Sequence, residues 1–185
     1  DISRKMTMDF KEEGDIIYML GAPVNDIASS QYLVHVAGVD LSPVPHFDLE
    51  EEWTLQQKLA ELIRSGLVRS AHDVSEGGLF VTLCESAFPR ELGFSIQTCG
   101  GIRKDACLFG EGQSRVVVTV SLDDVTAFEQ LLGDLPFEKI GVVSAGELVV
   151  DGDFWGSVDW WQEKYDTAIE NHLNQEEAGS ALSAI

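Results

Sequence analysis

Residues 70–79 read Ser-Ala-His-Asp-Val-Ser-Glu-Gly-Gly-Leu and place a polar turn between two apolar segments. We predict a short strand over 67–71 before the turn and a helix over 79–88 after it, with Pro89 just past the helix end. The helix is apolar on nearly all sides, which predicts that it is buried. Because a polar turn that opens a helix with glycines offers amide donors and side-chain acceptors to a ligand, this turn is the first candidate site.

The composition indicates one globular domain. The chain has 185 residues, 44% of them hydrophobic, and its 32 acidic and 12 basic side chains give a formal charge of −20. This charge argues against nucleic acid and anionic membranes as partners, and no apolar run approaches the ~20 residues of a membrane span. No signal-peptide pattern opens the chain, and its three cysteines show no C-x-x-C spacing. We therefore expect a cytoplasmic protein with reduced thiols and, because it begins without Met, a piece of a longer polypeptide.

The clearest helix pattern runs from Asp48 to Ser65. Asp48, followed three residues later by Glu51, has the pattern of a capping box, and Gly66 supplies a C-terminal stop. The continuous apolar run 16–20 suits a strand buried on both faces. Further strands are predicted over 93–98, 116–120, 137–143 and 147–150, and further helices from Ser121 to Leu132 and from Ser157 to Ile169.

Three segments carry weaker patterns. Residues 24–31 are read as a polar loop or short helical turn, and 32–36 as either a short strand or a helix end. The tail beyond Leu173 is polar and has little to bury, so we predict that residues 173–185 are disordered.

The first candidate turn has two readings. Its carboxylate at Asp73 suits a hard metal cation, which prefers oxygen ligands, beside a phosphate. Alternatively, Asp73 or Ser75 caps the following helix while His72 makes one structural hydrogen bond. If the strand continues through them, His72 and Asp73 point to opposite faces and need not act as a pair.

A second candidate site is the glycine-rich loop 110–114, which leads into the strand 116–120. Glu111, Gln113, Ser114 and Arg115 together can hold a polyol or a phosphate through hydrogen bonds and a charged fork. The alternative is that Arg115 begins the strand and pairs with one of the many surface carboxylates.

Three motifs together resemble one family. They are His-Asp-Val-Ser-Glu-Gly-Gly-Leu at 72–79, Leu-Phe-Gly-Glu-Gly-Gln-Ser-Arg at 108–115 and Lys-Met-Thr-Met-Asp-Phe-Lys at 5–11. Their order and spacing resemble the C-terminal AIR-synthetase-type domain of the phosphoribosylformylglycinamidine synthase family, over about residues 1–172. With the elements above, the resemblance implies an α+β fold, a layered mixed β-sheet with packed helices.

The resemblance also implies a chemistry. In the family, formylglycinamide ribonucleotide, ATP and ammonia from glutamine give the amidine, ADP and phosphate, with magnesium as a cofactor. The family's polypeptide is a tandem duplication, and this chain resembles the second copy of its C-terminal-type domain. The implied partners are the preceding domains and a glutaminase domain or subunit. The missing ATP-binding domain implies that the chain alone is inactive.

Internal pseudo-symmetry with the family's first copy implies the site residues. Asp73 corresponds to a magnesium ligand, and Glu111, Gly112 and Gln113 correspond to a loop that touches the substrate. The full set expected to bind substrate or nucleotide is His72, Asp73, Ser75, Gly77, Gly78, Glu111, Gln113, Ser114 and Arg115. Two other roles stay open: a module that binds a phosphorylated ligand by itself, and a purely structural or interaction domain.

Overall fold

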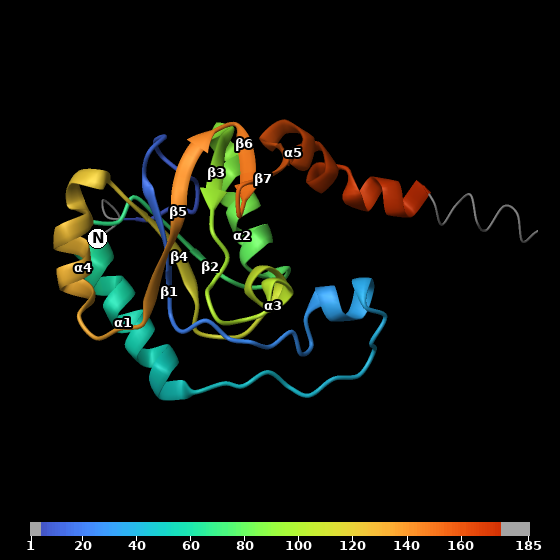
Figure 1. Ribbon diagram of the computed structural model, residues 1–185, viewed down its shortest axis with the longest axis horizontal. Coiled ribbons are helices and arrows are strands. Elements are labelled where there is room, and N and C mark those ends of the chain that lie inside the picture. Colours follow the sequence, from blue (N-terminus) through green and yellow to red (C-terminus); the bar gives the residue numbers. More distant parts are fainter. Residues whose placement is uncertain (1–4, 175–185) are drawn as a thin grey trace, which may run out of the picture.

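The computed structural model describes residues 5–174 and contains a seven-stranded sheet with the order β2-β4-β1-β5-β3-β6-β7 (Figure 1). All neighbouring strands are antiparallel except β3 and β6, which are parallel, so the sheet is mixed. The predicted α+β class is therefore confirmed. The strands are β1 (Ile16–Leu20), β2 (Ser70–Asp73), β3 (Leu92–Ile96), β4 (Val116–Val120), β5 (Phe137–Ala145), β6 (Glu147–Val150) and β7 (Asp153–Ser157).

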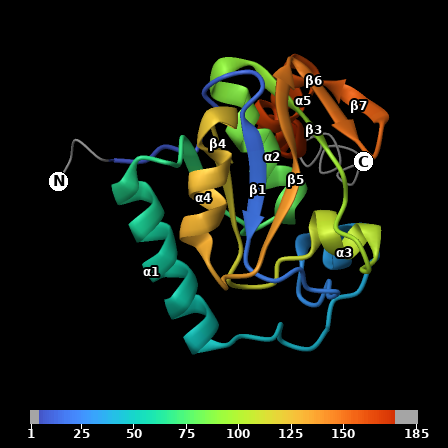
Figure 2. The ribbon, with the colours of Figure 1, turned by 60° about the vertical axis from the view of Figure 1, so that its left-hand side comes forward.

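Helices cover both faces of the sheet. In Figures 1 and 2, α1 and α4 lie on one side, and α2, α3 and α5 lie on the other. The helices are α1 (Leu49–Ser65), α2 (Gly78–Ala87), α3 (Lys104–Phe109), α4 (Val125–Leu132) and α5 (Val158–Asp166), with shorter turns η2 (Tyr32–Val36), η3 (Phe88–Arg90) and η4 (Leu122–Asp124). No helix among residues 5–174 is long and apolar enough to cross a membrane.

The inner strand β1 contributes side chains to two cores, one on each face of the sheet. Tyr18 joins the cluster that includes Leu62 of α1 and Phe128 of α4. Met19, the next residue, joins the cluster that includes Leu83 of α2. Because successive strand residues point to opposite faces, a strand covered on both sides is apolar throughout. All five residues of β1 are buried, which confirms the prediction for 16–20.

The first helix forms where its terminal signals predicted. The Asp48 side chain accepts hydrogen bonds from the N–H groups of Glu50 and Glu51 at 2.8 and 3.1 Å, which satisfies two amides that the helix itself leaves unpaired. Gly66 ends the helix with a left-handed φ of 79°.

The three cysteines, at 84, 99 and 107, are free and buried.

Several local predictions were wrong. The strand expected over 67–71 lies instead at 70–73, because its ladder with β4 pairs Ser70 with Thr119 and Asp73 with Val116. Of the two alternatives left open for 32–36, the strand is wrong and the helical one agrees with the structure, which has a single π-helical turn there. The short helix α3 and the edge strand β7 were not predicted, and both are short elements whose form depends on neighbours distant in sequence.

The C-terminal helical segment extends further than expected. After a turn at Thr167 the chain is helical again over 168–174, with the Asn171 N–H donating to the carbonyl of Thr167. Residues 173 and 174, where we predicted the disordered tail to begin, therefore belong to a helix. The rest of that tail, 175–185, lies outside the described residues.

The register of the sheet gathers four connections at one end. Asp73 at the end of β2 lies opposite Val116 at the start of β4. Val116 in turn lies opposite Leu20 at the end of β1, and Leu20 lies opposite Phe137 at the start of β5. The segments beyond these residues therefore meet at the same end of the sheet, and both candidate loops are among them.

Candidate functional site

The glycine-rich loop is held to two other segments by one carboxylate. Glu111 Oε1 accepts a hydrogen bond from the Gly77 N–H at 2.9 Å and another from the Gln31 N–H at 2.8 Å. These residues are 34 and 80 positions away in sequence. The structure thus brings the two predicted candidate sites together and adds the segment that ends at Gln31.

The contact between the turn and the loop depends on a glycine. A Cβ at Gly78 would lie 2.8 Å from the carbonyl oxygens of Leu108 and Gly110, closer than side-chain carbons approach main-chain oxygens. Gly78 also has φ +71°, which side chains disfavour. The start of α2 is therefore packed directly on the chain that leads into the loop. We call this contact region, formed by 77–78 and 108–111, the junction.

Arg115 is a buried part of the same assembly. Its Nε donates to the carbonyl of Gly112 at 3.0 Å and its Nη2 donates to the carbonyl of Gly110 at 2.6 Å. Burial lowers the pKa of the guanidinium, although arginine stays charged at neutral pH. The predicted pairing of Arg115 with a surface carboxylate is wrong, because its side chain is 3% exposed and turned inward. It stabilises the loop from beneath.

His72 and Asp73 lie on opposite faces of β2, as the alternation of a strand predicts. His72 faces α2, where its Nδ1 donates to the Thr82 carbonyl at 3.2 Å and its Nε2 lies 3.4 Å from Glu85 Oε2. Asp73 is exposed. The helix-cap reading is wrong, since the N-cap position of α2 is Gly77 and no side chain caps it. The reading of His72 as a structural residue agrees with its contacts.

The residues on the outer side of the junction remain open. Asp73, Ser75 and Gln113 are exposed, whereas the N–H groups of Gly77 and Gly78 already donate to Glu111 and to the Ser75 carbonyl. The start of α2 is thus already occupied by protein acceptors. We call the exposed residues Asp73, Ser75 and Gln113 the rim.

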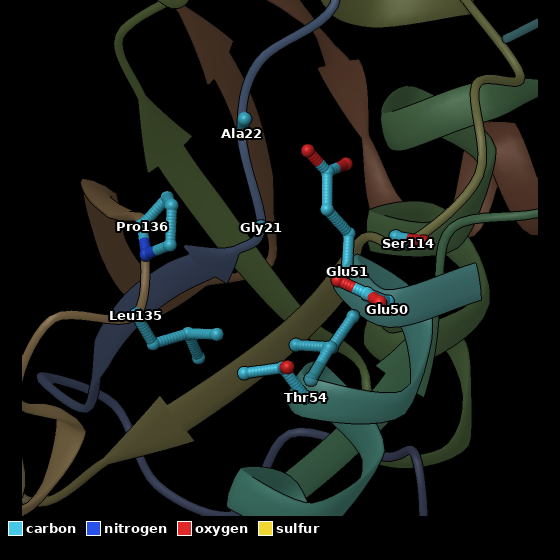
Figure 3. Close-up of a pocket in the computed structure, with 9 residues that line it drawn as sticks. Gly21, Ala22, Glu50, Glu51, Thr54, Ser114, Leu135 and Pro136 are labelled. Atoms are coloured by element: carbon cyan, nitrogen blue, oxygen red, sulfur yellow. The ribbon is translucent and has the colours of Figure 1, made fainter. Parts of the chain in front are cut away.

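A pocket of about 250 Å³ adjoins the loop at the same sheet end (Figure 3). Figure 3 shows Glu50, Glu51 and Thr54 of α1 facing Leu135 and Pro136 across it. Ser114 lines the pocket and donates to Glu52 Oε2 at 2.8 Å, which ties the loop to α1. Of the predicted site residues, only Ser114 lines this pocket.

Sequence reasoning missed the acidic first turn of α1 as part of the site. The run Glu50–Glu52 was read only as the start of a helix, because carboxylates are favoured at helix N-termini. The contact that places this turn beside the loop is the hydrogen bond from Ser114 to Glu52, which joins residues far apart in the sequence and has no local sequence signal.

The described residues supply part of a metal site at most. No group of three or more His, Cys, Asp or Glu side chains in the described part of the chain is arranged to hold a metal ion. Mg²⁺ commonly binds one or two carboxylates and completes its shell with water and substrate phosphates. Asp73, exposed at a strand end, fits the role of one such carboxylate.

The model of the family described as AIR synthase related protein, C-terminal domain, matches residues 12–152. The chain belongs to this family. The match covers the sheet from β1 to β6 and includes both candidate loops. The predicted AIR-synthetase-type C-terminal domain is therefore confirmed.

Two curated relatives with similar sequences carry the same name. The chain is 39% identical over 153 residues to phosphoribosylformylglycinamidine synthase subunit PurL of Caldanaerobacter subterraneus subsp. tengcongensis, covering 82% of the chain and 21% of the relative. It is likewise 39% identical over 150 residues to the subunit of the same name from Alkaliphilus metalliredigens, covering 80% and 20%. The chain thus spans about a fifth of the length of these relatives.

Solved structures share the fold. Thermotoga maritima PurL complexed with FGAR superposes with a TM-score of 0.71 at 17% identity, over 85% of this chain and 29% of that one. The hydrogenase maturation protein HypE in complex with ATP gives a TM-score of 0.59 at 17% identity, over 82% and 53%. At these identities the comparison establishes the shared architecture of an AIR-synthase-type C-terminal domain.

Proposed function

We propose that this chain is the C-terminal domain of an ATP-dependent phosphoribosylformylglycinamidine synthase of purine biosynthesis. The full-length enzyme would convert formylglycinamide ribonucleotide to the amidine, with glutamine as the nitrogen source and ATP and Mg²⁺ as cofactors. The proposal rests on the names of the relatives that are 39% identical. Its remaining partners would be the preceding domains and a glutaminase domain or subunit, all in the cytoplasm.

The division of the site into a fixed junction and an open rim supports the part of the proposal in which this chain is one domain of a larger enzyme. Glu111 and Arg115 are committed to protein main-chain groups. Asp73 and Gln113 are exposed at the same sheet end, and within the described residues their side chains have no hydrogen-bond partner. This arrangement suits one wall of a cleft whose other wall lies elsewhere in the polypeptide.

The rim would act by binding and orientation. The Gln113 amide can donate to and accept from a polar ligand, and the Asp73 carboxylate can hold Mg²⁺. When bound, Mg²⁺ would neutralise charge on nucleotide phosphates. Glu111 and Arg115 would keep the loop main chain fixed, so that Gln113 is presented in one position.

Turnover by the full-length enzyme tests the proposal. Asp73→Asn should reduce ATP-dependent amidine formation by roughly 100-fold, since the charge stabilisation that a catalytic metal provides amounts to several kcal/mol. Asp153→Asn, a matched change of an exposed carboxylate on β7, should leave turnover unchanged. Equal turnover by Asp73→Asn and the unsubstituted enzyme would contradict a binding role for the rim.

The isolated chain distinguishes this function from that of an independent binding module. We expect the 185-residue chain to form no amidine and to bind neither ADP nor the ribonucleotide tightly, because it supplies one wall of the cleft. Titration calorimetry with each ligand measures this directly. Tight binding to the isolated chain would instead favour the module.

A further inference from the structure

An exposed segment crosses the sheet end that carries the candidate site. Residues 36–53, here called the strap, run from η2 into the first turn of α1 (Figures 1 and 2). Six large apolar side chains in the strap are each more than half exposed: Val36, Leu41, Val44, Phe47, Leu49 and Trp53. Six such side chains within one 18-residue segment point to an interaction surface, because large exposed apolar patches are uncommon on domains that act alone.

The strap has little to hold it in place within the described residues. Over 40–47 its main chain makes no hydrogen bond to another described main-chain group. Its contacts with the rest of the domain include those of Ser29, which donates from its N–H to Ser42 Oγ at 2.6 Å and from its hydroxyl to the Pro43 carbonyl at 3.1 Å. Leu41, Val44 and Phe47 are thus exposed on a stretch of main chain that has no main-chain hydrogen bond to another described residue.

Both ends of the strap are fixed at the candidate site. On one side, Tyr32 of η2 stacks on Phe109 with ring centroids 5.0 Å apart, next to the Gln31–Glu111 contact. On the other side, Glu52 accepts from Ser114 of the loop. Both ends of the strap therefore lie next to the loop that carries Gln113, so we expect a body that covers the strap to reach this part of the rim.

The charge of the strap defines the surface that fits it. It carries five carboxylates, at Asp40, Asp48 and Glu50–Glu52, and neither Lys nor Arg. A second copy of this chain, with a formal charge of −20, would be repelled. A surface complementary to the strap has an apolar centre that is bordered by Lys or Arg side chains.

We infer that the strap is the surface on which another domain of the same polypeptide docks, through an apolar patch bordered by basic residues, and thereby closes the site. This inference rests on the proposed function, in which the chain is one domain of a larger enzyme. The relatives are about five times as long as the match, so such a domain is available within one polypeptide.

Cysteine labelling in the full-length polypeptide tests the docking. Val44 is 87% exposed in the isolated domain and Leu122 of η4 is 67% exposed. Leu122 follows β4, at the opposite end of that strand from the loop. Val44→Cys should react with a maleimide at least ten-fold more slowly than the matched control Leu122→Cys, measured by mass spectrometry of the labelled peptides. Equal rates would overturn the inference.

Two further measurements test whether the body that docks on the strap belongs to the same polypeptide. Protection of position 44 should be independent of protein concentration and present without a separate glutaminase subunit; protection that requires either high concentration or the subunit overturns the inference. In the double variant Leu41→Asp and Val44→Asp, amides 39–47 should exchange with deuterium at least ten-fold faster than in the unsubstituted polypeptide, whereas Leu122→Asp should leave their exchange unchanged. Unchanged exchange in the double variant also overturns it.

The outcome for docking can be separated from the outcome for catalysis. Amidine formation is measured on the unsubstituted full-length enzyme, and labelling of position 44 does not depend on turnover. Slow labelling in a polypeptide that forms no amidine supports docking and contradicts the proposed function. Fast labelling in an active enzyme contradicts docking alone.

Discussion

The junction and the rim lie within a few residues of each other and are built in opposite ways. In the junction, Glu111 binds main-chain N–H groups, Arg115 beneath it binds main-chain carbonyls, and Gly78 allows direct contact between the two motifs. In the rim, Asp73 and Gln113 face solvent. The difference shows that polar residues of one sequence motif divide into those that shape the site and those that remain available to a ligand.

The largest expected effect comes from breaking the junction sterically. Gly78→Ala should lower the free energy of unfolding by about 3 kcal/mol, because the new Cβ meets main-chain oxygens at 2.8 Å and φ is +71°. Gly66→Ala is the matched control, with a similar φ of +79° and open space around it, and should cost about 1 kcal/mol. Urea denaturation of the domain measures both, and equal losses would show that the junction is not tightly packed.

Removing the carboxylate that joins the three segments should have a smaller effect. Glu111→Ala loses two hydrogen bonds to main-chain N–H groups and should lower the free energy of unfolding by about 2 kcal/mol. Glu111→Gln keeps an oxygen acceptor and should lose roughly half as much. Chemical denaturation of the two variants provides the comparison. If both lose the same amount, the charge and not the acceptor geometry holds the segments together.

A substitution at His72 tests whether this residue is structural or binds a ligand. His72→Ala should lower the free energy of unfolding by about 1 kcal/mol, since it removes the hydrogen bond to Thr82 and the contact with Glu85. In the full-length enzyme the KM values for ATP and for the ribonucleotide should stay unchanged, because the side chain faces α2. A raised KM with unchanged stability would show that His72 takes part in ligand binding.

The smallest effect on folding is expected at the rim. Gln113→Ala should change the free energy of unfolding by less than about 0.5 kcal/mol, as exposed side chains without partners usually do. In the full-length enzyme it should nevertheless raise the KM for substrate or nucleotide several-fold. Thermal denaturation and steady-state kinetics on the same preparations give both values. A stability loss as large as that of Glu111→Ala would place Gln113 in the junction.

The parts of the fold that the sequence predicted are those fixed by local signals. The helix from Asp48 to Gly66 formed as expected because its cap and its stop lie within its own sequence. The all-apolar run of β1 predicted burial on both faces correctly. By contrast, β7 and α3 are short, and their neighbours in the fold decide their form.

The candidate site was predictable in composition but not in geometry. The two motifs that the sequence singled out meet at one end of the sheet, and the alternation of a strand separated His72 from Asp73 in advance. The Glu111 contacts span 34 and 80 residues, and no local pattern indicates them. The burial of Arg115 was missed because a lone arginine at a strand start usually reaches solvent.

The position of β1 in the sheet has a consequence for how the chain is made. Within this domain β1 precedes its two partners, β4 and β5, by about a hundred residues or more. On the ribosome, its apolar side chains and one edge must stay unpaired until β4 has emerged, and its other edge until β5 has emerged. We therefore expect nascent chains truncated before β5 to be substrates for chaperones and prone to aggregate.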